Sequence, residues 1–157
     1  MAGTETIQVS SVFKAPPEKI WPLLTHMDTL RYIASPYAAF VPAGKPSGET
    51  WRAGETYRFR LRVFGIIPLG VHTIRVQIFD HGKLRVQTAE NNRFVPTWNH
   101  CITLEPEGIS QTRYTDEVEI GAGRFTGLVR LWSAAFYRHR QKRWARLLAP
   151  NRNKPAG

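Results

Sequence analysis

The sequence is poor in cysteine and in uninterrupted apolar segments. Of its 157 residues only Cys101 is a cysteine, which excludes an internal disulfide and a CxxC metal knuckle. The longest apolar run, residues 63–71, is interrupted by glycine and proline and is far shorter than the roughly 20 residues of a membrane-spanning helix. The first ten residues contain neither a basic segment nor an apolar segment, so we expect no secretory signal and a cytoplasmic protein.

Acidic residues are absent from the C-terminal part of the chain. The sequence has 22 basic and 12 acidic residues, and from Arg124 onward it has nine basic residues and no acidic one. The remainder, with 13 basic and 12 acidic residues, is therefore nearly neutral, and all but one unit of the net charge of +10 belongs to this segment. A solvated helix face explains such a segment, and an anionic ligand or an anionic membrane surface are alternatives. We expect no nucleic-acid partner, because no known nucleic-acid-binding motif accompanies the charge.

The hydrophobic pattern predicts a strand, two short helices, several more strands and one long helix. The first strand lies within residues 4–13, and two prolines then open a helix that Pro22 shortens or kinks. Asp28 is the expected N-cap of the second helix. Alternating apolar residues predict strands near residues 37–44, 55–65, 71–80, 83–90, 97–104 and 110–120, with turns at 67–70 and 105–108.

The segment 125–148 has no proline and has apolar residues at helical spacing. Its expected buried face contains Phe125, Leu128, Val129, Trp132, Ala135, Phe136 and His139. This helix is the only element large enough to cover the apolar face of an antiparallel sheet. We therefore predict an α+β fold, in which a curved antiparallel sheet of about six to seven strands wraps around the C-terminal helix. Residues 1–149 form one domain in this prediction, and 150–157 form a disordered basic tail.

Three segments of the chain resemble the SRPBCC superfamily of helix-grip proteins. They are VFKAPPEKIWPLLTHMDTLRYI, TWNHCITLEPEG with the following TRYTDEVEI, and FYRHRQKRWARLL. The superfamily includes START-type lipid-transfer domains, birch-pollen-allergen-like proteins and polyketide cyclase/dehydrase-like proteins, and the likeness is greatest to a bacterial ligand-binding subgroup. It implies the fold but not the substrate, because this fold hosts many functions. The iron signature of ring-hydroxylating oxygenases and the glycine-rich loop of the allergen-like branch are both absent.

Polar residues occupy inward-facing positions on three of the predicted strands. His72 shares its parity with Ile74, Val76 and Ile78, and His100 shares its parity with Trp98, Ile102 and Leu104. Tyr114 and Asp116 are in phase with Val118 and Ile120. A three-residue turn at Pro106–Gly108 pairs His100 with Tyr114, and a five-residue loop pairs it with Asp116. Both registers bring His100 and Asp116 together on the inner face.

Three roles remain open for the His100–Asp116 pair. The two side chains can satisfy each other in an apolar interior, or contact a polar group of a ligand. They can also act in catalysis, with His100 as general acid and base and Asp116 fixing its tautomer. His72, His100 and Asp116 are chemically suited to zinc or iron. No closely spaced ligand motif supports such a site, so we expect neither a metal nor a cofactor.

Aromatic residues are numerous enough to line a hollow between the sheet and the helix. The candidates are Trp21, Tyr32, Tyr37, Trp51, Tyr57, Phe59, Trp98, Trp132 and Phe136. Arg143 shares a helix face with Trp132 and Phe136, which places it at the mouth of the hollow as a receptor for an acidic group. The predicted ligand-binding set is His72, Trp98, His100, Tyr114, Asp116, Trp132, Phe136, His139 and Arg143.

The favoured function is binding of a small hydrophobic molecule, lipid-, polyketide- or isoprenoid-like, by a carrier or sensor. One alternative is a cyclase/dehydratase-type enzyme that uses His100 and Asp116. The other alternative is peripheral binding to an anionic membrane through the basic C-terminal helix.

Overall fold

The computed structural model describes residues 3–44 and 48–150. The described strands form one antiparallel sheet in the order β1-β7-β6-β5-β4-β3-β2. The strands are β1 (Glu5–Phe13), β2 (Ala38–Pro42), β3 (Thr56–Val63), β4 (Ile67–Asp80), β5 (Arg85–Asn91), β6 (Thr97–Glu107) and β7 (Gln111–Gly121). The helices are α1 (Pro17–Leu24), α2 (Met27–Ala34), the short 3-10 helix η1 (Gly123–Phe125) and α3 (Thr126–Leu148). This architecture confirms the predicted helix-grip fold with two short helices after the first strand.

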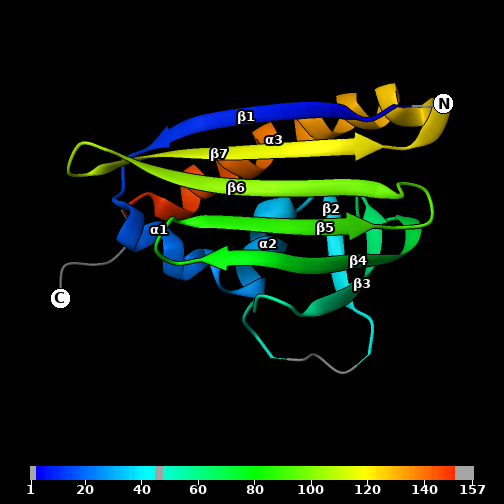
Figure 1. The fold of residues 1–157 in the computed structure, drawn as a ribbon, viewed down its shortest axis with the longest axis horizontal. Coiled ribbons are helices and arrows are strands. Elements are labelled where there is room, and N and C mark those ends of the chain that lie inside the picture. Colours follow the sequence, from blue (N-terminus) through cyan, green and yellow to red (C-terminus); the bar gives the residue numbers. More distant parts are fainter. Residues whose placement is uncertain (1–2, 45–47, 151–157) are drawn as a thin grey trace.

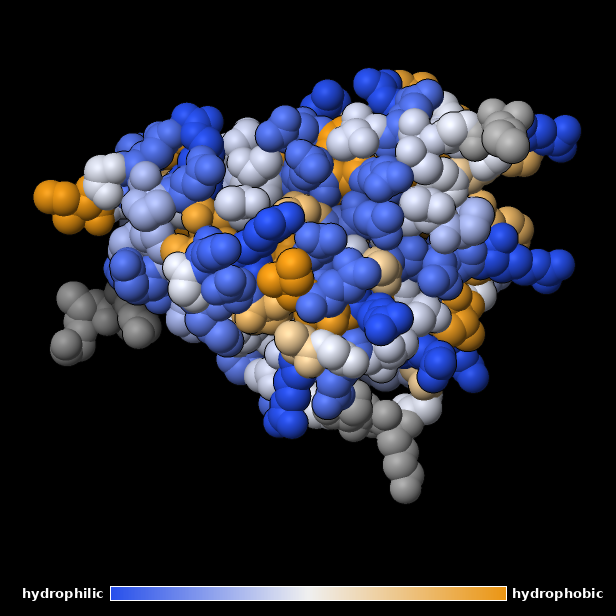
Figure 2. Space-filling view, in the orientation of Figure 1, coloured by the Kyte–Doolittle hydropathy of each residue, from blue (hydrophilic) through white to orange (hydrophobic). Residues whose placement is uncertain are grey.

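The helices all lie on one side of the sheet (Figure 1). The sheet is curved, and β2 runs steeply across the direction of β5 and β6 in that view. The opposite side of the sheet, seen in Figure 2, is mostly hydrophilic with scattered hydrophobic side chains. The apolar core therefore lies on the concave side, between the sheet and the helices, because only that face is shielded from water.

The two short helices follow from proline and from backbone pairing. Pro17 begins α1, and Pro22 lies inside a helix that has only eight residues. The predicted N-cap at Asp28 is wrong, because the N-cap is His26, two residues earlier, and α2 begins at Met27. The Met27 amide donates to the Glu49 carbonyl at 2.9 Å, which fixes the start of the helix. Asp28 instead lies in the first turn, where a carboxylate complements the helix dipole.

The hairpin between β6 and β7 is longer than the sequence predicts. His100 opposes Val118, and Asp116 opposes Ile102, so both predicted registers are wrong. The predicted turn at 105–108 is mostly strand, since β6 continues to Glu107 and the chain reverses at residues 108–110. Gly108 has a φ of 70°, and the positive-φ conformation that this turn requires is readily adopted by glycine. The shift is an even number of residues, so it leaves the inward parity unchanged.

A similar displacement occurs between β3 and β4. The predicted turn at 67–70 belongs to β4, and the chain reverses at residues 64–66 instead. Gly70, with a φ of 75°, accompanies a bulge that changes the register between Arg60 and Arg62. A second bulge, between Val76 and Ile78, turns Ile78 outward and makes the prediction that it faces the core wrong.

The buried face of α3 differs from the face that hydrophobicity predicts. Phe125 precedes the helix and Leu128 is 67% exposed. The buried residues are Thr126, Ser133, Phe136, Tyr137, Arg140, Gln141 and Trp144. Several of these are polar groups that enter the interior, and a count of apolar spacing cannot find them. The helix as a whole is therefore rotated relative to the predicted orientation.

No helix within residues 3–44 and 48–150 is both long and apolar enough to cross a bilayer. The predicted tail begins at Pro150, and its residues 151–157 lie outside the described residues.

Candidate functional site

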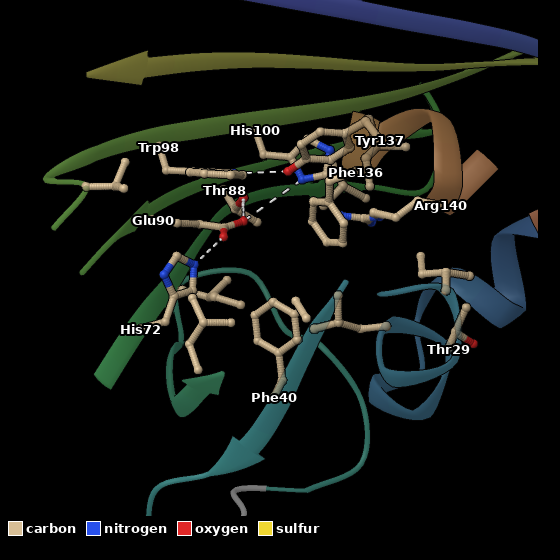
Figure 3. A pocket seen from close by; sticks show the side chains of 18 of the residues that line it. Thr29, Phe40, His72, Thr88, Glu90, Trp98, His100, Phe136, Tyr137 and Arg140 are labelled. Carbon is tan, nitrogen blue, oxygen red and sulfur yellow. Dashed lines mark hydrogen bonds and ion pairs between the residues drawn. The ribbon is translucent and has the colours of Figure 1, made fainter. Parts of the chain in front are cut away.

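A cavity of about 400 Å³ lies between the concave face of the sheet, α2 and α3. Its walls are mostly apolar and aromatic side chains. Phe40 of β2 and Phe136 of α3 approach the cavity from opposite sides in Figure 3. A cavity of this size and character suits a small hydrophobic molecule. Polar side chains are concentrated on the strands that form one wall.

Six of the nine predicted site residues line the cavity, namely His72, Trp98, His100, Tyr114, Trp132 and Phe136. The other three, Asp116, His139 and Arg143, do not. His139 contacts the backbone carbonyl of Ser35 through Nε2 at 2.6 Å, and its ring lies 4.7 Å from that of Tyr37. These contacts of His139 hold α3 against the segment that links α2 to β2.

Arg143 does not reach the cavity mouth as predicted. Its guanidinium lies 4.0 Å from the centre of the Tyr32 ring, and its Nε donates to the Tyr32 carbonyl at 3.1 Å. Helical geometry places Arg140, three residues earlier, toward the interior instead. The sequence therefore predicts an inward arginine on α3 but identifies the wrong one.

Asp116 lies behind His100 and holds it in place. Oδ1 of Asp116 is 2.6 Å from Nε2 of His100, and its Oδ2 accepts a hydrogen bond from Nε2 of Gln141 at 3.0 Å. Gln141 Nε2 also donates to the Val9 carbonyl at 2.7 Å, which ties α3 to β1. A carboxylate only accepts hydrogen bonds, so the His100 proton sits on Nε2 when the ring is neutral. Nδ1 is then the nitrogen left for other partners.

Glu90 of β5 lies between the two histidines and is not among the site residues that the sequence predicts. Its Oε2 is 2.7 Å from Nε2 of His72, and its Oε1 accepts from Thr88 at 2.7 Å and lies 3.9 Å from Nδ1 of His100 (Figure 3). The strand parity of β5 could have indicated it, because Glu90 shares one face of the strand with Val86 and Thr88. Two histidines and two carboxylates thus alternate across four adjacent strands.

The tautomer of His72 follows from Asn92. The Oδ1 atom of Asn92 accepts the backbone amides of Phe94 and Val95, both at 2.9 Å, so its NH₂ group must point the other way. That group lies 3.1 Å from Nδ1 of His72, which therefore accepts. The ring proton of His72 is consequently on Nε2, where it is donated to Glu90.

The environment keeps Glu90 ionised. Burial by itself raises the pKa of this carboxyl, but the hydrogen bonds from His72 and Thr88 and the electrostatic influence of the two imidazoles outweigh burial, so the pKa lies below its ordinary value. Glu90 is thus a buried carboxylate with donors on both oxygens. Such an arrangement can orient a polar ligand group or transfer protons through His100.

Arg140 and Tyr137 complete the polar part of the cavity from α3. The Tyr137 hydroxyl accepts from the Trp98 indole at 3.0 Å, and its ring lies 4.9 Å from that of His100. Burial raises the pKa of Tyr137, so its hydroxyl stays protonated. Burial by itself lowers the pKa of Arg140, but opposing influences, the negative charge of Asp116 foremost among them, outweigh burial, and the pKa lies above its ordinary value.

Within residues 3–44 and 48–150, no group of three or more His, Cys, Asp or Glu side chains is placed to hold a metal ion.

Part of the basic C-terminal segment is engaged within the protein. Arg140 is buried, Arg143 stacks on Tyr32, and Nε of Arg130 lies 3.2 Å from a carboxylate oxygen of Glu5. The exposed basic side chains of α3 also include Arg138, Lys142 and Arg146. The charge available to an outside partner is thus smaller than the sequence suggests.

Solved structures with a similar fold come from bacteria and a plant. A START superfamily protein of Mycobacterium smegmatis matches with a TM-score of 0.68 at 12% identity, over 89% of this chain and 94% of that one. Truncated norcoclaurine synthase of Thalictrum flavum matches with a TM-score of 0.69 at 13% identity, over 96% and 97% of the two chains. Protein CV1439 of Chromobacterium violaceum matches with a TM-score of 0.68 at 18% identity, over 93% and 98%.

These likenesses confirm the helix-grip fold and, at such low identity, nothing about the ligand. No curated protein matches the sequence. Residues 11–148 match a family model described as a domain of unknown function, and the chain therefore belongs to this family, DUF8410.

Proposed function

We propose that this protein binds a small hydrophobic molecule that has one polar end, and acts as its carrier or sensor. The apolar part of the ligand occupies the cavity between the sheet and α3, and the polar part faces the polar side chains that line it, among them His100 and Tyr114 of the sheet and Arg140 of α3. The lipid-, polyketide- or isoprenoid-like classes all have this form.

The observation that carries the proposal is the cavity of about 400 Å³ with mostly apolar walls and few, clustered polar groups. Close packing is the rule in protein interiors, and voids larger than a water molecule are few. A cavity of this size loses dispersion contacts unless something fills it. The polar cluster then orients the occupant, as in other small-molecule sites.

Native mass spectrometry of freshly purified protein, with organic extraction of anything bound, tests the proposal. We expect a stoichiometric adduct of an apolar molecule, or stoichiometric uptake of the neutral fluorophore N-phenylnaphthylamine by protein that was purified empty. A protein that carries no adduct and takes up no fluorophore would contradict the proposal.

A matched pair of variants on β2 separates the cavity from the surface. Ala38 lines the cavity, and Val41, three residues later, is 51% exposed. Ala38→Phe places a benzyl group in the cavity and is expected to abolish binding, whereas Val41→Phe adds the same group outside and leaves binding intact. Equal binding by both variants would locate the ligand elsewhere.

A second candidate function is favoured by the alternation of histidines and carboxylates. In a cyclase/dehydratase-type enzyme, Nδ1 of His100 takes or gives the proton, and Asp116 holds the ring through Nε2. The fold accommodates such chemistry, as one structural neighbour is a synthase by name. The test uses the molecule extracted from the cavity, incubated with stoichiometric protein and followed for loss of water or ring closure. Turnover by the wild type and not by His100→Gln supports an enzyme that uses His100, equal turnover by both excludes this role of His100, and no turnover by the wild type argues against the enzyme.

The membrane alternative has less support. It depends on exposed residues of α3 such as Arg138, Lys142 and Arg146, because Arg140 and Arg143 are engaged elsewhere. Association with anionic vesicles that disappears in moderate salt would support it. A protein that remains unbound at low salt would exclude it.

A further inference from the structure

The cavity has hydrogen-bond donors without acceptors at the end formed by α3 and β7. Among the described residues, Nε of Arg140, Nε1 of Trp144 and the hydroxyl of Tyr114 are buried and have no hydrogen-bond partner. All three residues line the cavity. Buried polar groups are normally satisfied, so a cluster of unsatisfied ones requires a physical reason.

Arg140 is the strongest of these groups. Its side chain is almost completely buried, with 6% of its surface exposed, and it extends from α3 toward the cavity (Figure 3). The guanidinium lies over the rings of Tyr137 and Phe136, at 4.9 and 5.6 Å, and forms no ion pair with a described carboxylate. Cation–π contacts stabilise the charge through the faces of the ring and leave the N–H groups, which lie in the guanidinium plane, without acceptors.

Asp116 does not supply the missing acceptor. Its charge acts on Arg140 from a distance, but its Oδ1 is engaged by His100 and its Oδ2 by Gln141. Glu90 is similarly occupied by His72 and Thr88. The carboxylates of this wall are therefore already engaged by their own donors.

The other two groups at this end are also donors. The indole of Trp144 donates only, and the rings of Tyr114 and Trp144 lie 5.6 Å apart. Burial and the charge of Asp116 raise the pKa of Tyr114, so its hydroxyl keeps its proton. If the Trp144 indole meets the Tyr114 oxygen, the hydroxyl proton of Tyr114 still lacks an acceptor. This end of the cavity therefore lacks oxygen atoms that could accept hydrogen bonds from these donors.

We infer that Arg140, Tyr114 and Trp144 form a subsite for a ligand group with acceptor oxygens and no donor hydrogen, a carboxylate or a carbonyl. The inference rests on the proposed binding function and adds the chemistry and location of the ligand's polar end. A group with two acceptor oxygens matches the planar fork of an arginine. Hydrogen bonds to a charged donor in a buried site are among the stronger ones in proteins.

Three probes with the same undecyl chain test the inference by isothermal titration calorimetry, namely dodecanoate, methyl dodecanoate and undecyltrimethylammonium. We expect the two oxygen-bearing probes to bind at least tenfold more tightly than the cation, which has no acceptor and repels Arg140. Comparison of dodecanoate with its methyl ester distinguishes an ionised from a neutral acceptor. Tight binding of the cation, equal to that of the other two, overturns the inference.

The variant Arg140→Met removes the donors and the charge and keeps much of the volume. We expect it to weaken the two oxygen-bearing probes about tenfold or more and to leave the cation equal or tighter, since one charged hydrogen bond corresponds to such a factor. Arg138→Met on the exposed face of the same helix is the control and should change none of the three affinities.

Circular dichroism establishes that Arg140→Met and Arg138→Met are folded. A third variant, Arg140→Lys, keeps the positive charge and should lose less affinity for dodecanoate than Arg140→Met. If Arg140→Met is folded and binds all three probes as the wild type does, the subsite is overturned while ligand binding stands. If the wild type binds none of the three, the proposed function fails together with the subsite.

Discussion

Nε2 of His100 and Oδ1 of Asp116 are 2.6 Å apart, although the two residues are not opposite each other in the sheet. His100 opposes Val118, and Asp116 lies two positions before Val118 in β7, on the same face. Diagonal neighbours of this kind are within reach of long side chains. The contact therefore depends on parity, which is set by the alternation of residues, more than on the length of the hairpin.

The first prediction concerns this contact. Asp116→Asn replaces one acceptor oxygen by an NH₂ group, which then faces a donor of either His100 or Gln141. We expect the free energy of unfolding to fall by about 1–3 kcal/mol, the usual cost of an unsatisfied buried polar group. Urea denaturation measures the change, with Glu117→Gln, an exposed neighbour on the same strand, as the control. Equal stability of the two variants would show that the buried pair is of no consequence for folding.

The second prediction concerns the attachment of α3 to the sheet. Gln141 bonds to Val9, Asp116 and Ser11, and thus joins the helix to β1 and β7. Gln141→Met keeps the length of the side chain but leaves these polar groups unsatisfied, at an expected loss of about 2–3 kcal/mol. Lys142→Met makes a comparable change on the exposed side of the helix and should have little effect. The prediction fails if thermal melting does not separate the two variants.

The third prediction is a dependence of stability on pH that arises from Glu90. Its pKa in the folded protein lies below the ordinary value of 4.5, so the folded state binds protons less tightly than the unfolded state. The resulting stabilisation is complete above pH 4.5 and is lost as the pH falls through the folded-state pKa. Unfolding free energies of the wild type and Glu90→Gln should therefore converge as the pH is lowered below 4.5.

Exposed Glu117 provides the comparison for this experiment. The difference in unfolding free energy between the wild type and Glu117→Gln should be small and nearly constant over the same pH range. If the difference in unfolding free energy between the wild type and Glu90→Gln stays constant or widens as the pH falls, the pKa of Glu90 is not lowered by folding.

The fourth prediction concerns the contact between α2 and α3. Arg143 stacks on Tyr32 at 4.0 Å and donates to its carbonyl, which ties the end of α2 to the C-terminal helix. Arg143→Ala removes both interactions and should speed amide hydrogen exchange in α2 while leaving β6 and β7 unchanged. We expect about tenfold faster exchange, as for a loss of about 1–2 kcal/mol. Arg146 is exposed and lies about one helical turn after Arg143. The control variant Arg146→Ala should therefore leave the amide exchange of α2 as it is in the wild type.

Several features of the site required the folded chain. The sequence places Glu90 in phase with Val86 on β5, but its position between His72 and His100 depends on the order of the strands. Strand order is a matter of long-range pairing and leaves no local trace in the sequence. The bulge near Ile78 likewise changes which side chains face inward without any glycine or proline to signal it.

The sequence by itself determined the order of the elements, the single long C-terminal helix, and the inward direction of His72, His100, Tyr114 and Asp116. These features follow from the two-residue period of strands and from the positions of proline and glycine, which act over a few residues. Only the tertiary structure decided the rotation of α3, which buries Arg140 in place of Leu128. That rotation balances apolar burial against the hydrogen bonds of Gln141 and the aromatic contacts of Arg140, and those partners are distant in the sequence.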